Sequence, residues 1–171
     1  MVSIAEKQFE TEIEAALLAQ GYEKGKPEDY DPALVLLPKT VVRFVQATQP
    51  KEWAKLKEQY KDEAQERFLA RLSSEIARRG TLDVLRNGIK DVGARVQLAF
   101  YRSPTKLNPE TERLYKANVF TIVRQLEYKE ANGKPRYPDL VVFLNGLPLF
   151  TAELKNPLTG QSVKNAITQY R

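Results

Sequence analysis

Two apolar runs separated by an Asn-Gly pair constrain the fold of this chain more than any other feature of its sequence. Residues 139–144 read DLVVFL, and residues 147–154 read LPLFTAEL. Both runs are short, apolar and rich in residues that favour strands, so they predict two neighbouring strands buried on both faces of a sheet. Asn145-Gly146 between them predicts a β-hairpin turn.

Charged side chains stand at the ends of this predicted hairpin. Asp139 opens the first strand, Glu153 lies near the end of the second, and Lys155 follows Glu153 at the next position but one. Because side chains alternate along a strand, Glu153 and Lys155 share a face. Burying such charges costs free energy unless they are paired or bind a metal. These residues are therefore a candidate site, and a salt bridge between Lys155 and one of the acids is the alternative.

The hairpin turn decides whether Asp139 and Glu153 share a face. A regular two-residue loop at Asn145-Gly146 would place Asp139 opposite Ala152, and Glu153 would then point the other way. A three-residue loop with its glycine in the left-handed position of a bulge would place Asp139 opposite Thr151, and the charged groups would converge. We therefore predict a three-residue loop or an equivalent bulge.

The residue types that the chain lacks restrict the chemistry of such a site. None of its 171 residues is His or Cys, which excludes cysteine nucleophiles, zinc sites built from Cys and His, and histidine bases. Two carboxylates, with a carbonyl such as that of Leu154, are suitable ligands for Mg²⁺. The metal would activate a water for phosphodiester hydrolysis, and the ammonium group of Lys155 would position that water or help to deprotonate it. A glycosidase-like carboxylate pair fits less well, because sugar hydrolysis needs neither a metal nor a neighbouring lysine.

The remaining sequence predicts helices around a sheet. Apolar residues at helical spacing predict helices over 4–20, 51–79 and 109–117, one or two helical turns over 81–87, and a last helix over 161–171. Strand-like patterns cover 95–101 and 119–128, whereas proline-rich loops are predicted over 25–38, with a short buried run at 34–37, and over 129–138. The segment 51–79 is interpreted as an amphipathic helix packed on the core rather than as a partner-binding face.

The positive charge belongs to the half that contains the candidate site. Residues 1–85 hold 13 basic and 15 acidic residues, whereas residues 86–171 hold 14 basic and 7 acidic residues. This distribution favours a polyanionic partner such as nucleic acid, and a solvated basic face is the alternative.

Size and composition predict one domain over residues 1–171, because 42% of the residues are hydrophobic and can form one sizeable core. The first residues lack the composition of a signal or transit peptide, and no run approaches the roughly 18 apolar residues of a membrane span. We therefore expect a soluble, cytoplasmic protein with no membrane partner. The chain ends inside its last predicted helix, so we expect it to be a fragment of a longer protein.

The candidate site resembles a known nuclease motif. Pro138-Asp139 followed by Glu153-Leu154-Lys155 has the form of the PD-(D/E)xK motif. The runs 143–149 and 153–157 are similar to the nuclease region of the motor (restriction, R) subunits of type I restriction enzymes. Further similar segments lie at 9–13, 21–22, 46–50, 79–86 and 166–170. The resemblance implies an α/β restriction-endonuclease-like fold, a mixed central sheet flanked by helices, to which the long helix over 51–79 is added.

The same resemblance assigns roles to individual residues. It implies that Asp139 and Glu153 bind the metal and that Lys155 supports the attacking water. Gln169 matches the glutamine of the family's third motif and would contact DNA near the site. Tyr170 follows Gln169 directly, closer than the family's tyrosine, and is expected to pack on the sheet.

An additional acid on the first helix is also implied. Glu10 would contact the metal through water, and Glu12 and Glu14 are alternatives for this role. Candidates for contacts with DNA phosphates are the basic residues Arg95, Arg102, Arg124, Lys134 and Arg136.

The implied function is Mg²⁺-dependent hydrolysis of double-stranded DNA within a type I restriction complex, with modification and specificity subunits as partners. The chain has no G-x-x-x-x-G-K-[ST] phosphate loop, so ATP-driven translocation is assigned to helicase lobes outside it. The alternative is a nuclease-fold module without activity that binds DNA or helps to assemble the complex.

Overall fold

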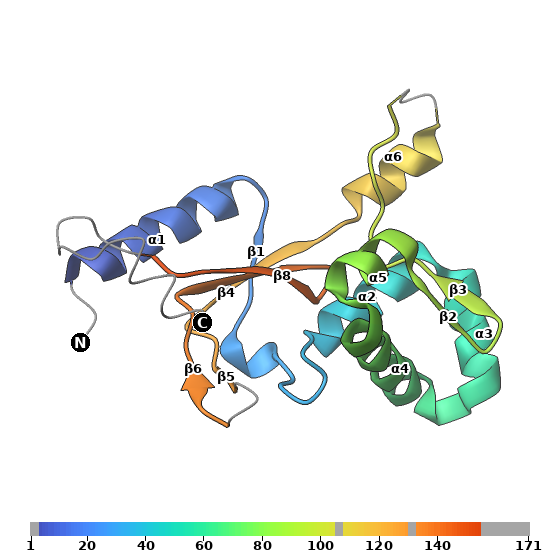
Figure 1. The fold of residues 1–171 in the computed structure, drawn as a ribbon. Helices are drawn as coiled ribbons and strands as arrows, with labels where there is room; N and C mark the ends of the chain where they lie inside the picture. Colours follow the sequence, from blue (N-terminus) through green and yellow to red (C-terminus); the bar gives the residue numbers. More distant parts are fainter. Residues whose placement is uncertain (1–3, 105–107, 130–132, 155–171) are drawn as a thin grey trace.

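A four-stranded mixed sheet organises the chain (Figure 1). The computed structural model describes residues 4–104, 108–129 and 133–154. The strand order is β1 (Glu23–Lys24), β4 (Phe120–Arg124), β7 (Leu140–Leu144) and β8 (Leu147–Ala152). Strand β1 runs parallel to β4, and the other neighbours are antiparallel. The predicted α/β class with a mixed central sheet and flanking helices is confirmed.

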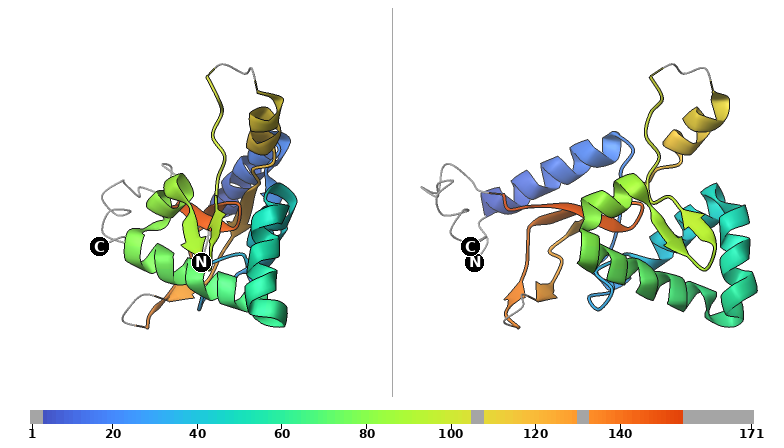
Figure 2. Two further views of the ribbon diagram at one scale, coloured as in Figure 1. Left: turned by 90° about the vertical axis from the view of Figure 1, so that its right-hand side faces the viewer. Right: turned by 45° about the vertical axis from the view of Figure 1, so that its right-hand side comes forward.

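Helices flank this sheet on one face and at one end (Figure 1). Helix α1 (Ile4–Ala19) lies over one face, and a body of helices stands at the far end of the sheet (Figures 1 and 2). That body consists of α2 (Pro38–Thr48), α3 (Pro50–Tyr60), α4 (Ala64–Arg79), α5 (Thr81–Asn87) and the hairpin of β2 (Ile89–Asp91) with β3 (Ala94–Val96). Helix α6 (Pro109–Lys116) projects from the molecule, and the hairpin of β5 (Tyr128–Lys129) with β6 (Pro135–Arg136) precedes β7. Within the described ranges, no helix has the length and apolar character needed to cross a membrane.

Strand β7 is buried on both faces, as predicted for its apolar run. Leu140 and Val142 pack with α1, whereas Val141 and Phe143 pack on the opposite face. On that opposite face Tyr30, from the loop between β1 and α2, contacts Phe143 with ring centroids 6.0 Å apart. The alternation follows from the two-residue period of a strand, and it places α1 and the 25–37 loop on opposite sides of the sheet.

The same prediction is wrong for β8, which is the edge strand of the sheet in the described part of the chain. Leu147 is fully buried, but Phe150 is 51% exposed. Of the two hairpin strands, only β7 has a paired strand on each side, so β8 is less buried than its apolar composition suggested.

The single helix predicted over 51–79 is also wrong, because the chain reverses at Lys61. Lys61 has φ +54° and ψ −125°, and the one-turn segment Lys61–Glu63 separates α3 from α4. In a straight helix Trp53 and Phe68 would lie about 22 Å apart, yet their ring centroids are 5.8 Å apart. Burial of both aromatic rings in one core therefore outweighs the continuous helical pattern.

Other predicted elements agree with the structure to differing extents. The helices over 4–20, 81–87 and 109–117 are confirmed, and Gly21 and Gly80, both with positive φ, follow the ends of α1 and α4. Helix α2 was not predicted; its buried face is rich in β-branched Val residues, which weaken a helical signal. The strand predicted over 95–101 is reduced to β3, and the helix predicted over 161–171 lies outside the described residues.

The turn between β7 and β8 joins three parts of the molecule. Asn145 is fully buried, and its Oδ1 accepts a hydrogen bond of 2.7 Å from the N–H of Val119. Its Nδ2 donates to the carbonyl of Leu98 at 2.8 Å and to Oδ1 of Asn118 at 2.9 Å. The carbonyl of Gly146 accepts a bond from the N–H of Leu37, at the start of α2. The turn therefore connects the sheet to both the helical body and the α6 segment.

We predict that Asn145→Ala destabilises the fold by about 2 to 4 kcal/mol, because buried donors and acceptors lose their partners and alanine is less tolerant of φ +53°. Chemical denaturation monitored by circular dichroism measures this loss. Asn87→Ala is the control, because Asn87 is exposed and bonds only to Asp83 among the contacts seen. A similar stability for both variants would contradict the role of Asn145.

Candidate active site

A β-bulge in the β7–β8 hairpin sets the register of the candidate site. Next to the turn, Leu144 lies opposite Leu147, as in a two-residue loop. Further along, Val142 lies opposite Phe150 instead of Leu149, so β8 contains one extra residue. Every later residue of β8 is shifted by one position relative to a regular hairpin.

This bulge brings Asp139 and Glu153 opposite each other. The three-residue loop is wrong, because Asn145-Gly146 forms a two-residue turn with positive φ at both residues. The equivalent bulge is confirmed, since Leu140 pairs with Ala152. Extending this register by one position, just beyond the ends of both strands, puts Asp139 opposite Glu153, rather than opposite Ala152 or the Thr151 expected from a longer loop.

Packing of the neighbouring residues supports a shared face. Leu140 and Ala152 both belong to the apolar cluster beneath α1. Because side chains alternate along a strand, the adjacent Asp139 and Glu153 both point toward the opposite face. Carbons β of directly opposed residues in an antiparallel pair are about 5 Å apart, so the two carboxylates can act on one ligand.

The Asp139 carboxylate is held in place by groups from the strands on either side. Its Oδ2 accepts a hydrogen bond of 2.7 Å from the N–H of Leu154, beyond the end of β8. Its Oδ1 lies 3.5 Å from Nε2 of Gln125, beyond the end of β4. Asp139, Glu153 and Leu154 are all half-buried. A carboxylate in this position is oriented by its neighbours and still reaches the surface.

The donor set of this site suits a hard divalent cation. It offers carboxylate and carbonyl oxygens and no nitrogen or sulfur ligand, which is the preference of Mg²⁺. Over residues 4–104, 108–129 and 133–154, no group of three or more acidic side chains gathers in a metal-binding arrangement. The described part of the site thus contributes two carboxylates. Lys155, Gln169 and Tyr170 lie outside the described residues, so their predicted roles stay predictions.

Glu10 lies on the other face of the sheet, in an ion-pair cluster with Arg124. Its Oε2 is 2.6 Å from Nη2 of Arg124, and the residue is only 2% exposed. Glu14, also buried, lies 3.4 Å from Arg124 and 3.0 Å from Lys24. Arg124 pairs with Leu140 across β4 and β7 and therefore shares the α1 face, whereas Asp139 points to the opposite one. A metal contact of Glu10 is not evident from this placement and stays a prediction.

Arg124 is the counterion of the two buried acids in this cluster. Burial lowers the pKa of its guanidinium, but the hydrogen bond and charge of Glu10, with those of Glu14, outweigh this effect and raise it. Arg124 is therefore charged at neutral pH and compensates two buried carboxylates. To contact DNA as predicted, the Arg124 guanidinium would have to bind a phosphate while it remains paired with Glu10 and Glu14.

The other basic candidates divide between the two ends of the molecule. Arg136 in β6 and the exposed Lys134 lie in the hairpin just before Asp139. Arg95 lies in β3 of the helical body, and Arg102 lies near α6, 3.8 Å from Glu112. Figure 1 shows both of these elements at the end of the sheet away from the β5–β6 hairpin. Of these four residues, Lys134 and Arg136 are the ones in the segment that leads directly into Asp139.

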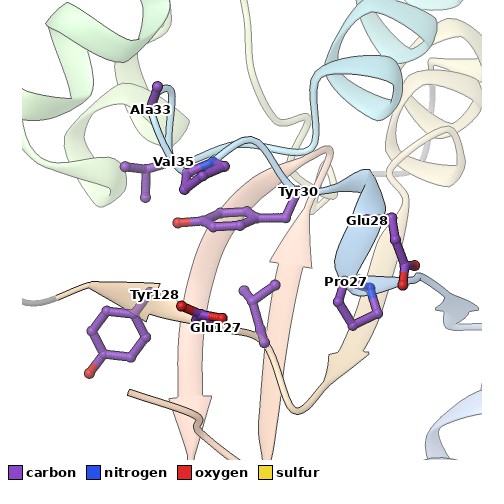
Figure 3. Close-up of a pocket in the computed structure, with 9 residues that line it drawn as sticks. Pro27, Glu28, Tyr30, Ala33, Val35, Glu127 and Tyr128 are labelled. Atoms are coloured by element: carbon purple, nitrogen blue, oxygen red, sulfur yellow. The ribbon is translucent and has the colours of Figure 1, made fainter. Parts of the chain in front are cut away.

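A groove of about 810 Å³ opens on the 25–37 loop (Figure 3). Tyr30 and Val35 line it on the loop side, and Glu127 and Tyr128 line it on the side of β5. Among the described residues, none of the predicted site residues lines this groove. Its charged lining residues, Glu28 and Glu127, are acidic, which disfavours a phosphate ligand there.

Gln125 and the N–H of Leu154 are the site groups that the sequence did not reveal. Gln125 belongs to no recognised motif, and Leu154 is the variable position of the Glu153-Leu154-Lys155 motif, where the sequence suggested a role only for its carbonyl. Their proximity to Asp139 depends on how β4, β7 and β8 are aligned, which no local pattern states. Only the unusual positive φ of Gln125 marks it, and that is visible only in the structure.

Comparisons with known proteins place these observations in a family context. The family described as type I restriction enzyme R protein N terminus matches residues 3–171. The MjaIXP endonuclease subunit named for a type I restriction enzyme of Methanocaldococcus jannaschii is 41% identical over 56 residues, 32% of this chain and 5% of the relative. The type I restriction enzyme HindI endonuclease subunit of Haemophilus influenzae is 54% identical over 41 residues, 24% of this chain and 4% of the relative. No solved structure is significantly similar to the chain.

We predict that Arg124→Met destabilises the fold by about 3 kcal/mol at neutral pH, because it leaves Glu10 and Glu14 buried without their shared cation. Denaturation curves of the variant and of the wild type at neutral pH measure this loss.

A double-mutant cycle provides the control for this prediction. Glu10→Gln should destabilise Arg124→Met much less than it destabilises the wild type, because the unpaired charge is then absent. Additive effects of the two substitutions would contradict the assignment of Arg124 as the counterion of α1.

Proposed function

The chain belongs to the family of type I restriction enzyme R protein N termini, and on this basis we propose that it is the DNA-cleaving domain of such a subunit. The named relatives are endonuclease subunits, which agrees with a nuclease role. We place the active site at the ends of β7 and β8. This site would catalyse Mg²⁺-dependent hydrolysis of DNA phosphodiesters.

The observation that carries this proposal is the bulge at Leu149. Without it Glu153 would share the α1 face with Leu140, whereas with it Glu153 lies opposite Asp139. A bulge interrupts the hydrogen bonds of a ladder and re-aims the side chains that follow. Two half-buried acids at the end of a largely apolar hairpin are costly to place together unless they are paired or bind a metal. Cation binding by this pair would account for both the bulge and the placement of the acids.

The residues of the chain have separate tasks in this proposal. Asp139 and Glu153 hold the metal, and the N–H of Leu154 orients the Asp139 carboxylate. Lys155 positions the attacking water, and Gln169 contacts the DNA, as the family resemblance implies. Magnesium would supply stabilisation of the negative charge that develops on the phosphodiester.

The β5–β6 hairpin is the proposed DNA contact. Lys134 and Arg136 lie in the segment that leads into Asp139, and Tyr137 between them and the site is 51% exposed. Basic side chains this close to the acidic pair would bind backbone phosphates and position the scissile bond. Such contacts carry no sequence information, which suits a cleavage domain whose target is chosen by another subunit.

We propose that other parts of a restriction complex perform the remaining activities. The segments matched in the two relatives span 5% and 4% of those proteins, so most of their length has no counterpart in the match. We assign ATP-driven translocation to such further regions, and we assign DNA modification and target recognition to separate subunits. Cleavage by this domain then follows translocation.

We predict that Asp139→Asn and Glu153→Gln each lower the rate of DNA cleavage about 100-fold or more, because each removes a metal ligand. The measurement is cleavage of circular DNA by the intact complex with ATP and Mg²⁺. Asp62→Asn is the matched control, since Asp62 is exposed in the turn between α3 and α4. It should cleave at the wild-type rate.

The same experiment separates this proposal from a binding or assembly module. If the intact wild-type complex cuts no faster than the Asp139→Asn variant, the enzyme assignment is lost. DNA binding that survives both substitutions, and that weakens as salt increases, would then favour the module.

A further inference from the structure

Gln125 occupies the position next to Asp139 on the third strand of the site. Arg124 pairs with Leu140 across β4 and β7, so Gln125 lies opposite Asp139 at the following position. The N–H of Gln125 donates to the carbonyl of Asp139 at 3.3 Å. Together with Glu153 on the other side, the three residues form one row across the ends of β4, β7 and β8.

The backbone of Gln125 adopts a conformation that its residue type disfavours. Its φ is +51°, a left-handed value that is unusual for a residue other than Gly, Asn or Asp. Val123 and Leu126 are both buried in the cluster on the face of Tyr30, so the strand alternation is broken between them. The turn at Gln125 lets Leu126 enter that cluster and leaves the Gln125 side chain exposed beside Asp139.

The Asp139 carboxylate has a hydrogen-bond donor on each of its two oxygens. Leu154 donates to Oδ2 from one side, and Nε2 of Gln125 approaches Oδ1 to 3.5 Å from the other. Two donors, one on each oxygen, restrict rotation of the carboxylate plane. A carboxylate has about four lone-pair positions, so two such bonds are compatible with cation binding.

We infer that Gln125 is a positioning residue of the active site, which holds the Asp139 carboxylate in the orientation needed to bind the metal. The inference rests on the function proposed for Asp139 and Glu153. A neutral amide is the suitable group for this position: it donates a hydrogen bond without adding negative charge to two carboxylates, and without neutralising them as a lysine would. Groups that orient metal-binding carboxylates typically affect metal affinity or activity by about 10- to 100-fold when they are removed.

Variants of Gln125 can separate its amide from its backbone conformation. Gln125→Met keeps the length of the side chain but removes the donor, and Gln125→Gly removes the side chain and relieves the positive φ. We expect both to lower the cleavage rate of the intact complex about tenfold, or to raise the Mg²⁺ concentration for half-maximal cleavage by a similar factor. Gln125→Gly should nevertheless keep or raise the melting temperature, so the loss cannot be ascribed to unfolding.

Lys61→Gly is the matched control for backbone strain. Lys61 has φ +54°, nearly the value of Gln125, but it lies in the turn between α3 and α4. Lys61→Gly should also keep or raise the melting temperature, and its cleavage rate and Mg²⁺ dependence should equal those of the wild type. Wild-type cleavage by both Gln125 variants, in a complex that Asp139→Asn inactivates, would overturn the inference and leave the proposed function intact.

A second measurement tests the contact without any cleavage. In nuclear magnetic resonance spectra of the 171-residue chain, the side-chain amide signal of Gln125 should shift when Asp139 is replaced by Ala, and its protons should exchange faster with water. The amide of the exposed Gln59 in α3 should not change. An unchanged Gln125 amide would overturn the inference even if the chain were not a nuclease.

Discussion

The buried hydrogen bonds of Asn145 are the interaction on which the arrangement of the molecule depends. They join the β7–β8 turn to the Leu98 carbonyl in the helical body and to Asn118 and Val119 at the start of β4. A fully buried amide that keeps all its partners specifies one arrangement, because any other leaves polar groups unpaired. Because these bonds fix the turn, the bulge at Leu149 changes only the pairing beyond it, where β8 is shifted by one residue relative to β7.

The two faces of the sheet consequently have different chemistry. On the α1 face, Arg124 compensates Glu10 and Glu14, and these charges are buried and paired. On the other face, the exposed Gln125 and the half-buried Asp139 and Glu153 form a row at the strand ends. Paired buried charges hold an element in place, whereas partly exposed acids placed side by side can bind a cation. The sheet thus separates the charges that attach α1 from the acids that we propose to bind the metal.

Much of the fold and part of the site could be predicted from local pattern. Residue type and spacing predict the amphipathic helices, the apolar strand β7 and the Asn145-Gly146 turn. They also identify Asp139 and Glu153 as candidate site residues. The failures have a common cause in long-range packing. The Trp53–Phe68 contact breaks a helix that looks continuous, and the burial of α2 overrides its strand-like valines. Contacts between residues distant in sequence outweigh local preference in both cases.

By itself, the sequence limited the chemical groups that this protein can use, because a chain without His or Cys is left with carboxylates, lysine, tyrosine and hydroxyls, and could bind a metal only through oxygen. It also determined that Asp139 and Glu153 stand at the ends of one hairpin. Only the tertiary structure decided that they share a face, since a single inserted residue reverses every side chain beyond it. The same holds for Gln125, whose relation to Asp139 exists only across the paired strands.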